Sequence, residues 1–368
     1  MDKQLKYKIA ITLIPDIGPI LAKKVIAYVG SIEGIFSEKK RNLIKIPGIG
    51  EYLANGIINQ NVLERAEKEI EFIEKFSIES FFYLDKNYPE RLKQCNDAPV
   101  LLYSKGKTNF NAAKVISVVG TRTATSYGKD ICASLISRLA EKGHDILIVS
   151  GLAFGIDITA HKCALQNNFK TVAVLGHGLD IIYPAAHRNI AKEIVGQGAL
   201  LTEYPNKSVC DKYNFVMRNR IVAGMADATL VIESTEKGGA LITAKIANSY
   251  NRDVLAVLGK SNDKYSKGCN YLIKRNLAHL VESVEDIEYV LGWDTVSQKK
   301  EIQASLSFVP MNENENKIFQ LLQKEGEMQI DLISRKTDIP VHVLAALMLN
   351  LEFSGVVKFL PGNSYKIL

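Results

Sequence analysis

The chain has 368 residues, of which 47% are hydrophobic and 23% are charged, and its formal net charge at pH 7 is +6. This length and composition predict two or three globular domains with buried cores. No apolar run approaches the length of a membrane span, so we expect no membrane partner. The positive charge is concentrated in residues 106–292, but so small an excess does not by itself establish nucleic-acid binding.

The cysteines and histidines indicate which cellular compartment and which metal sites are compatible with the sequence. Five cysteines are scattered along the chain, and no two of them have the CxxC spacing of a zinc knot. The odd number also argues against a disulfide framework. The six histidines are scattered too, so we expect no bound metal. The opening MDKQLKYKIA lacks the apolar core of a signal peptide. These features predict a protein of the reducing cytoplasm.

Residues 1–105 are predicted to form a helical domain. LIPDIGPILAKKVIAYVG (13–30) and LIKIPGIGEYLANGI (43–57) each combine an apolar helix end, a glycine-containing turn and a second helix. They resemble tandem helix-hairpin-helix units of a SAM-like domain, whose glycines let backbone amides approach a DNA phosphate. A purely structural role for these hairpins remains equally open. A connector follows at 81–106, in which Pro89 and Pro99 would break any helix.

Residues 106–292 are predicted to form an α/β domain. Near-continuous apolar runs alternate with helical segments at 128–143, 155–166 and 185–198, which indicates parallel strands covered on both faces. The six runs occupy 114–120, 146–151, 171–176, 199–204, 228–234 and 253–259. We therefore predict a Rossmann-like, doubly wound, mainly parallel sheet, whose ligands bind at the carboxyl ends of the strands.

Three turns follow the first three runs of this predicted sheet. They begin at Gly120, Ser150 and Gly176. The third turn, GHGLDI, has Ile181 where a dinucleotide fingerprint needs its last glycine, so we expect no nicotinamide or other organic cofactor. After the second turn, Asp157 and His161 have the i, i+4 spacing that allows a hydrogen bond. No third catalytic member has suitable spacing, so we interpret the two as a structural pair.

The stretch from Lys212 to Lys245 combines cations, an aromatic residue and a glycine turn. It predicts a helix beginning just after Phe215, a buried strand, and a second helix opening at Gly238-Gly239. Both helix starts suit phosphate. Arginine side chains chelate phosphate, and a ring among cations stacks on bases for about 1–3 kcal/mol each. The arginines could instead pair with carboxylates such as Asp157 or Glu203, and Phe215 could be core. We favour a site for unpaired nucleic acid.

The end of the chain is predicted to hold a linker and a winged helix. Residues 293–312 are weakly patterned and form the linker. Residues 313–368 predict three helices followed by a hairpin, VVKFLPGNSYKI. The third helix would normally read a major groove, but VHVLAALMLNLEF contains Glu352 and no Lys or Arg. Core packing or a protein partner is therefore preferred to DNA, and both remain open.

Six segments in the first 290 residues resemble one family in their order and residues. They are VVGTRTATSYG (118–128), SGLAFGIDITAH (150–161), LGHGLDIIYP (175–184), LLTEYP (200–205), FVMRNRIVAGMADATLVIES (215–234) and GGALITAKIA (238–247). Together they resemble the DNA-processing protein A family (DprA, also called Smf). The resemblance implies a cytoplasmic bacterial protein that binds single-stranded DNA without sequence preference. It also implies protection of incoming strands during natural transformation, loading of RecA recombinase, and a homodimer through the Rossmann-like domain.

The same resemblance implies a set of site residues. The DNA-binding set comprises Thr121, Arg122, Lys212, Phe215, Arg218, Asn219 and Arg220, with Arg188 and Lys245 as weaker members. The turns that would cradle phosphate contain Gly120, Gly151, Gly176, Gly178, Gly238 and Gly239.

An enzyme is the alternative interpretation of the same stretch. RNRIVAGMADATLVIESTEKGGALITAKIA also resembles the nucleotide phosphoribohydrolases of the Lonely-guy type, which carry a catalytic Glu three residues after a Thr. If Thr243 takes the Thr position, Ile246 occupies the Glu position, and Glu233 lies before the glycine turn. Glycosidic cleavage would then lack its acid/base group. We therefore expect a binding protein and not an enzyme.

Overall fold

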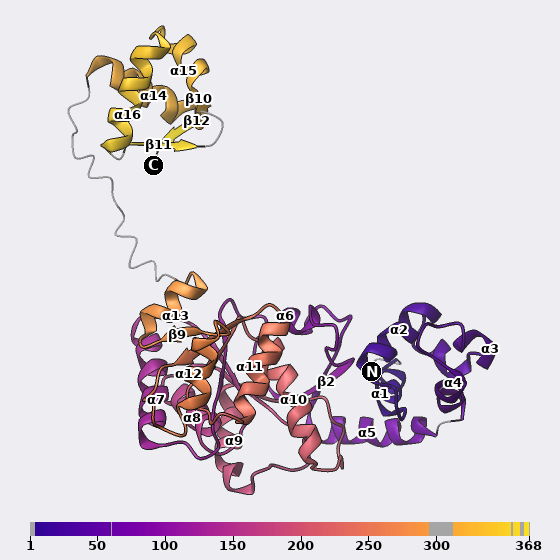
Figure 1. The fold of residues 1–368 in the computed structure, drawn as a ribbon. Coiled ribbons are helices and arrows are strands. Elements are labelled where there is room, and N and C mark those ends of the chain that lie inside the picture. Colours follow the sequence, from indigo (N-terminus) through magenta and orange to yellow (C-terminus); the bar gives the residue numbers. More distant parts are fainter. Residues whose placement is uncertain (1–3, 60, 294–311, 355, 361–363, 368) are drawn as a thin grey trace. The chain divides into compact units, whose positions relative to one another are not determined.

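The computed structural model describes residues 4–59, 61–293, 312–354, 356–360 and 364–367. The chain divides into two compact units, Met1–Thr295 and Val296–Leu368, which are drawn in Figure 1. Of the linker expected at 293–312, residues 294–311 lie outside the described residues. Among the residues that are described, no helix is both long enough and apolar enough to span a bilayer.

The first unit begins with short helices that form the predicted helical part. Turns at residues 14–18 and 44–50 join two helix pairs. In the second turn Gly48 has a φ of 94°, which favours glycine. The Tyr52 hydroxyl donates to Asp16 Oδ2 at 2.9 Å, so the two hairpins contact each other. The helices are α1 (Leu5–Leu13), α2 (Pro19–Val29), η1 (Gly34–Ser37), α3 (Lys40–Leu43), α4 (Glu51–Ile58) and α5 (Val62–Phe76).

A nine-stranded sheet forms the centre of this unit, in the order β1-β2-β6-β5-β4-β3-β7-β8-β9. All neighbours from β6 to β9 in that order are parallel, and β1 and β2 add antiparallel strands at one edge. The predicted doubly wound, mainly parallel sheet is thus confirmed. Its strands are β1 (Glu79–Phe82), β2 (Leu101–Gly106), β3 (Val115–Val119), β4 (Leu147–Ser150), β5 (Thr171–Val174), β6 (Ala199–Thr202), β7 (Ala228–Val231), β8 (Asp253–Val257) and β9 (His279–Val281).

Two of these strands lie in the segment that we expected to be only a connector. Within residues 81–106, the end of β1 and all of β2 flank a short helix, α6 (Glu90–Lys93). Strand β2 pairs antiparallel with β6, so that Tyr103 lies opposite Thr202. Such a pairing depends on a partner about a hundred residues away, and the local pattern of apolar residues does not reveal it.

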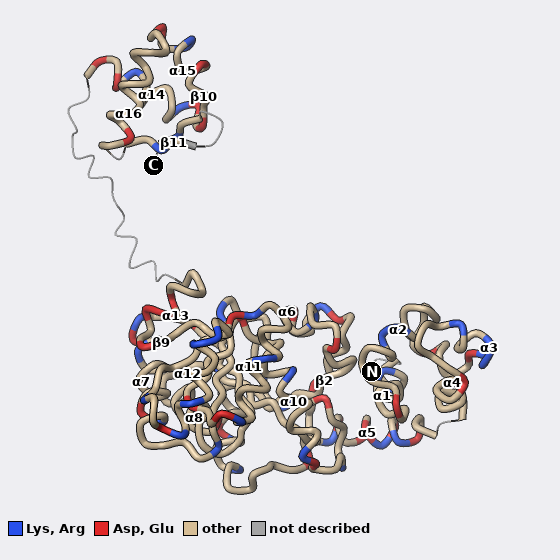
Figure 2. The backbone as a smooth tube through the Cα atoms, in the orientation of Figure 1, with Lys and Arg blue, Asp and Glu red and all other residues tan. Residues whose placement is uncertain are grey.

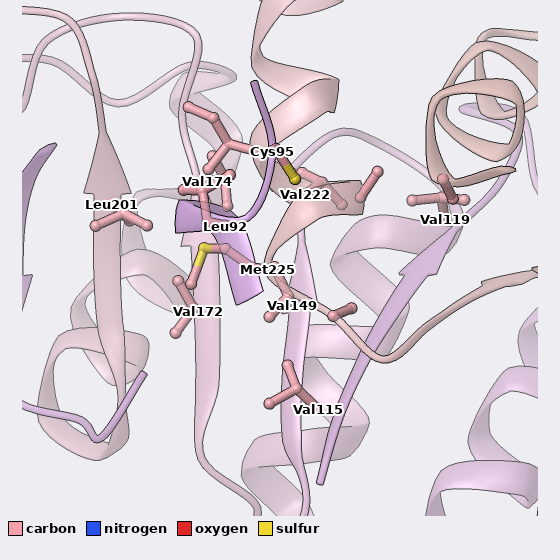
Figure 3. Packing of buried hydrophobic residues seen from close by; sticks show 14 of the residues in the cluster. Leu92, Cys95, Val115, Val119, Val149, Val172, Val174, Leu201, Val222 and Met225 are labelled. Carbon is pink, nitrogen blue, oxygen red and sulfur yellow. The ribbon is translucent and has the colours of Figure 1, made fainter. Parts of the chain in front are cut away.

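Helices cover both faces of the sheet. On one face lie α7 (Ser126–Glu141), α8 (Ile156–Gln166), η2 (Ala185–His187) with α9 (Arg188–Gln197), and α13 (Val284–Leu291); on the other lie α10 (Lys212–Gly224), α11 (Gly239–Ser249) and α12 (Lys267–Lys274). Alternate residues of a strand supply the two cores, because side chains alternate between faces. Val118 packs under α7 and α8, whereas Val119 packs on the side of α10. Figure 3 shows Val222 and Met225 beside Val149 and Val174 in the second core.

Helix α10 begins earlier than its sequence predicted. We expected a start just after Phe215, but the helix runs from Lys212 to Gly224. Asp211 is its N-cap, and the Asp211 side chain accepts a hydrogen bond from the Tyr213 amide. Phe215 and Arg218 therefore lie on the side of the helix and not at its positive end. The predicted helix start after Phe215 is therefore wrong, and phosphate binding at the start of this helix stays a prediction. Helix α11 does open at Gly239, with Gly238 as its N-cap.

The second unit is a winged helix, as predicted. Helix α14 begins with a capping box formed by Asn312 and Glu315. A core that includes Ile318, Leu344 and Met348 holds the three helices against a small sheet of order β10-β12-β11. The elements are α14 (Glu313–Glu325), β10 (Met328–Gln329), α15 (Ile330–Thr337), α16 (Val341–Phe353), β11 (Val357–Leu360) and β12 (Ser364–Ile367).

Candidate nucleic-acid interface

A small pocket of about 40 Å³ opens at the carboxyl ends of β3, β4 and β5. Each of the three predicted turns contributes to this edge of the sheet, and α10 supplies the remaining wall. The side chains and backbone that line it include Arg122, Gly151, Phe154, Tyr183, Phe215 and Arg218. The pocket therefore lies at the edge of the sheet where the sequence predicted the site, and its role in binding stays a prediction.

Arg218 forms the floor of the pocket. Its side chain is only 4% exposed, and Nη1 donates to the carbonyl of Val174. A Cβ at Gly151 would lie 2.1 Å from this nitrogen, so only a glycine lets the guanidinium lie against the turn after β4. Nε of Arg218 is buried without a hydrogen-bond partner. Burial lowers the pKa of Arg218, and the nearby Asp157 opposes that effect. The floor therefore holds a desolvated cation with unused donor capacity.

Phe215 and Tyr183 form an aromatic wall beside this cation. Their ring centroids lie 5.4 Å apart, and Tyr183 is 52% exposed. A Cβ at Gly176 would lie 2.8 Å from Cδ1 of Phe215, so the ring packs directly on the turn after β5. Buried His177 accepts the Tyr183 amide at Nε2 (3.3 Å), which leaves Nδ1–H to donate to the Gly178 carbonyl at 2.8 Å. These bonds hold the Tyr183 loop against the Phe215 ring.

Arg122 stands at the mouth of the pocket on a fixed turn. The Thr121 amide donates to the Glu233 carbonyl at 2.8 Å, and the Thr121 carbonyl accepts from the Ile156 amide at 3.2 Å. The guanidinium of Arg122 is exposed and makes no hydrogen bond or ion pair within the part of the chain that the structure describes. A free cation on a rigid backbone is thus available for an anion.

Asp157 and His161 are not the pair that their spacing predicted. Asp157 accepts from the Ala153 amide, and burial raises its pKa against the opposing charge of Arg218. His161 Nδ1 lies 2.7 Å from Thr171 Oγ1, whose own hydroxyl donates to the Ile148 carbonyl at 2.9 Å. Nδ1 of His161 must therefore carry the proton. The prediction of a hydrogen bond between the two side chains is wrong, because each has a nearer partner elsewhere.

Lys212 and Asn219 belong to the face of α10 that carries Phe215, because they lie three residues before it and four after it. Arg220 points elsewhere. It donates to the Asp97 carbonyl at 2.8 Å and forms an ion pair with Glu203. Arg220 is therefore engaged with a carboxylate, as the alternative interpretation allowed, and does not line the pocket.

Two further predicted cations lie apart from Phe215. Arg188 is exposed at the start of α9 and lines a separate cavity of about 610 Å³, together with Lys105 and Lys192. Lys245 is exposed within α11 and is not part of the pocket lining. The structure does not bring either residue to the pocket, and their contact with DNA stays a prediction.

The glycines of the predicted phosphate turns make close contacts with protein. A Cβ at Gly120 would meet Ile156 Cγ1 at 2.4 Å, and one at Gly178 would meet the Pro205 carbonyl at 2.4 Å. At Gly238 it would meet the Ser234 hydroxyl at 2.3 Å. At Gly239 there is nothing within 4 Å. Packing thus explains most of these glycines, and a contact of their amides with phosphate stays a prediction.

Sequence reasoning missed four lining residues, Ala153, Phe154, Tyr183 and Pro184. All four lie inside two segments that the sequence analysis had already quoted, SGLAFGIDITAH (150–161) and LGHGLDIIYP (175–184). For Phe154 and Tyr183, the available signal was an aromatic residue that follows the carboxyl end of a predicted parallel strand. A ring at that position lies outside the apolar runs that form the core and can instead stack on a ligand.

Glu233, which lies before the turn at Gly238-Gly239, has a structural role. It is buried, and its Oε1 accepts from the Thr125 hydroxyl at 2.5 Å while Oε2 accepts from the Thr125 amide at 3.0 Å. Thr125 in turn caps the start of α7. No group of three or more His, Cys, Asp or Glu side chains that could hold a metal ion occurs among the described residues.

The fold and the pocket together define a Rossmann-like protein with an arginine-rich, aromatic-walled pocket across the carboxyl edge of its sheet. The chain belongs to the family of DNA recombination-mediator protein A, whose family model matches residues 79–292. The model of the DprA winged helix domain matches residues 305–363.

Similar proteins cover most of the chain. Protein Smf of Synechocystis sp. is 31% identical over 354 residues, which cover 94% of this chain and 82% of that protein. The crystal structure of DNA processing protein A from Streptococcus pneumoniae has a TM-score of 0.67 and 33% identity, and covers 77% of this chain and 97% of its own. A Helicobacter pylori structure that concerns the single-stranded DNA binding mode of its DNA processing protein A has a TM-score of 0.53 and 28% identity, covering 60% and 97%.

Proposed function

We propose that this protein binds single-stranded DNA without sequence preference and acts as a recombination mediator. In this role it protects incoming strands during natural transformation and loads RecA recombinase on them. The observation that carries the proposal is one pocket that combines the unpaired Arg122, the buried Arg218 and the half-buried ring of Phe215. Membership in the recombination-mediator family and the Helicobacter pylori relative support it.

The chemistry of the pocket favours unpaired strands over duplex DNA. Guanidinium groups bind phosphate oxygens of either form. Stacking on Phe215 and Tyr183, however, needs a base whose face is free, and bases inside a duplex are already stacked on each other. Every base has such a face, so binding through stacking and phosphates is tolerant of sequence.

The protein performs no chemistry on the strand in this proposal and needs no metal or organic cofactor. Glu233 is buried and occupied with Thr125, and Ile246 stands where a phosphoribohydrolase would need its carboxylate. Incubation with AMP, followed by chromatography for adenine, tests the enzyme alternative. Released adenine that depends on protein concentration would establish that alternative.

The central test is fluorescence anisotropy with a labelled oligo-dT and a duplex of equal length. We expect tighter binding of the single strand, and affinity that falls linearly with the logarithm of salt concentration as counterions are released. Arg122→Ala combined with Phe215→Ala should weaken binding at least tenfold, because it removes a phosphate contact and about 1–3 kcal/mol of stacking.

Lys170→Ala is the matched control for that test. Lys170 is an exposed cation just before β5, at the opposite edge of the sheet, so its removal should leave the affinity unchanged. Arg218→Ala with Lys212→Ala is a second combination that should lose most of the affinity while the circular dichroism spectrum is retained. Equal affinity for duplex and single strand would contradict the proposal.

The proposed partners need separate measurements. We expect a homodimer through the Rossmann-like domain, which sedimentation equilibrium of the chain without its winged helix would detect. RecA loading predicts faster RecA ATP hydrolysis on strands already coated with single-strand-binding protein. An Arg122→Ala and Phe215→Ala double variant should lose that stimulation, since it cannot hold the strand.

A further inference from the structure

A second, larger cavity begins where the Phe215 pocket ends. It has a volume of about 780 Å³ and lies between the start of α7 and the exposed side of α8. Arg122 and Phe154 line both cavities, so the two adjoin each other at these side chains. A strand that occupies the first pocket and continues past Arg122 and Phe154 would therefore reach the second cavity.

Phe154 stands at the junction of the two cavities. Its ring is 48% exposed, yet it is held from one side by the buried His187 ring, with centroids 4.7 Å apart and planes at 68°. His187 in turn makes a hydrogen bond of 2.8 Å from Nδ1 to the Leu152 carbonyl. A large apolar side chain that is fixed in place and half open to solvent resembles a stacking platform more than a core residue.

Two cations lie beyond this ring. Lys129 on α7 and Lys162 on α8 both line the second cavity and are exposed. Neither has a carboxylate partner within the residues that the structure describes. The neighbouring cavity farther along α8 still includes Lys162 but adds Glu193, so the uninterrupted positive stretch ends there. An unpaired ammonium at each wall suits the regularly spaced phosphates of a strand.

We infer that the second cavity is an extension of the strand-binding site. Phe154 stacks on a base that leaves the Phe215 pocket, and Lys129 and Lys162 contact the phosphates that follow. This inference rests on the proposed function and gives the strand a path from α10, across the sheet edge at Arg122, to the side of α7 and α8. The cavity with Arg188, Lys105 and Lys192 shares no lining residue with the Phe215 pocket and does not belong to this path.

The experiment compares oligo-dT of increasing length, from a few nucleotides that fill only the Phe215 pocket to about twenty. The variants are Lys129→Gln with Lys162→Gln, Phe154→Ala and Phe154→Tyr. We expect the lysine double variant to bind the shortest oligonucleotides as the wild type does, and to lose at least tenfold in affinity for the longest. Its salt slope on long strands should decrease by about 1.4, since each single-strand phosphate contributes about 0.7.

Phe154→Ala should lose roughly tenfold in affinity for long strands and clearly less for the shortest strands, because Phe154 borders the Phe215 pocket as well as the second cavity. Phe154→Tyr should restore the wild-type affinity, because the ring is retained. Lys170→Gln is the control for a neutralised lysine outside the path, and should change neither affinity nor slope.

The outcomes separate the two proposals. In one outcome, the lysine double variant and Phe154→Ala bind long strands with wild-type affinity and salt slope. That result would overturn the proposed extension and leave the proposal for the Phe215 pocket standing. Equal losses on the shortest and longest strands would also overturn it, since the residues would then act inside the first pocket or on the fold. Failure of the wild type to bind any length would instead reject the proposed function.

Discussion

Gly151 and Gly176 determine how close Arg218 and Phe215 come to the sheet. At each glycine a Cβ would enter the space of a pocket side chain, at 2.1 Å from Arg218 Nη1 and at 2.8 Å from Phe215 Cδ1. At Gly176 the backbone of Phe215 is also only 3.1 Å away, so a substitution there would displace α10. At Gly151 the obstacle is the end of a flexible side chain, which can move at small cost.

Gly151→Ala should therefore weaken binding of oligo-dT without a change in charge. We expect at least a fivefold rise in Kd, because the guanidinium must leave the pocket floor, and a change in stability below about 1 kcal/mol. Anisotropy and urea unfolding measure the two effects. Gly196→Ala is the control, since it lies in α9 with nothing within 4 Å of its added Cβ. Unchanged affinity in Gly151→Ala would show that the position of Arg218 does not matter for binding.

His161 is a buried histidine that remains neutral. Burial is the main cause that lowers its pKa from 6.5 to about 3, with smaller contributions from the charges of Arg218 and His187. Nε2 is buried without a partner, so nothing compensates for a second proton. Between these two pKa values the His161 side chain is protonated in the unfolded chain and neutral in the folded chain. The stability from this group is therefore complete above pH 6.5 and is lost as the pH falls toward 3.

The expected loss from His161 alone is about 2 kcal/mol between pH 7 and pH 5. Urea unfolding at both pH values should thus show a smaller pH-dependent loss in His161→Gln than in the wild type, even if the variant is less stable at pH 7. His279→Gln replaces an exposed histidine on β9 and should keep the wild-type difference. The same pH dependence in all three proteins would contradict the assignment.

At the scale of elements, helix α5 anchors the loop that leads into α10. Both carboxylate oxygens of the buried Glu69 accept from the Asn206 amide, at 3.0 and 3.1 Å. Arg65 lies 3.0 Å from Glu69 and donates through Nη2 to the Asn206 carbonyl at 2.5 Å. The helical part and the segment between β6 and α10 are thus joined by a buried polar contact, whose desolvated groups depend on one another.

Glu69→Ala should lower the free energy of unfolding by about 1–3 kcal/mol, because it leaves the Asn206 amide buried without its acceptor. Urea unfolding gives the magnitude, and limited proteolysis should show faster cleavage in residues 203–211. Glu67→Ala removes a neighbouring carboxylate on the same helix, where the ion pair with Lys6 is exposed and contributes little. A loss in Glu69→Ala no larger than in Glu67→Ala would mean that α5 does not anchor this loop.

At the scale of the whole molecule, the pocket and its extension both belong to the first compact unit. Figure 2 shows Lys and Arg positions interspersed with Asp and Glu positions along the backbone of each unit. In the winged helix, α16 contains Glu352 and no Lys or Arg. Side chains that could neutralise a phosphate are absent from the helix that would enter a groove.

A chain that ends at residue 293 should therefore bind oligo-dT within about twofold of the full chain and with the same salt slope, since it keeps every proposed phosphate contact. Anisotropy over a range of salt concentrations provides the comparison. A tenfold loss of affinity, or a shallower slope, would show that the winged helix contacts DNA. A retained slope leaves a protein partner as its function.

The sequence by itself determined the class of fold and the edge of the sheet at which the pocket lies. Short, continuous apolar runs that alternate with helical segments are typical of parallel strands covered on both faces, and the turns after such strands meet at one edge. Only the tertiary structure decided which arginine enters the pocket. Arg218 and Arg220 are two residues apart, so their side chains diverge by about 200° around α10. The packing of that helix turns Arg218 toward Gly151 and Arg220 toward Glu203, and no local pattern records this rotation.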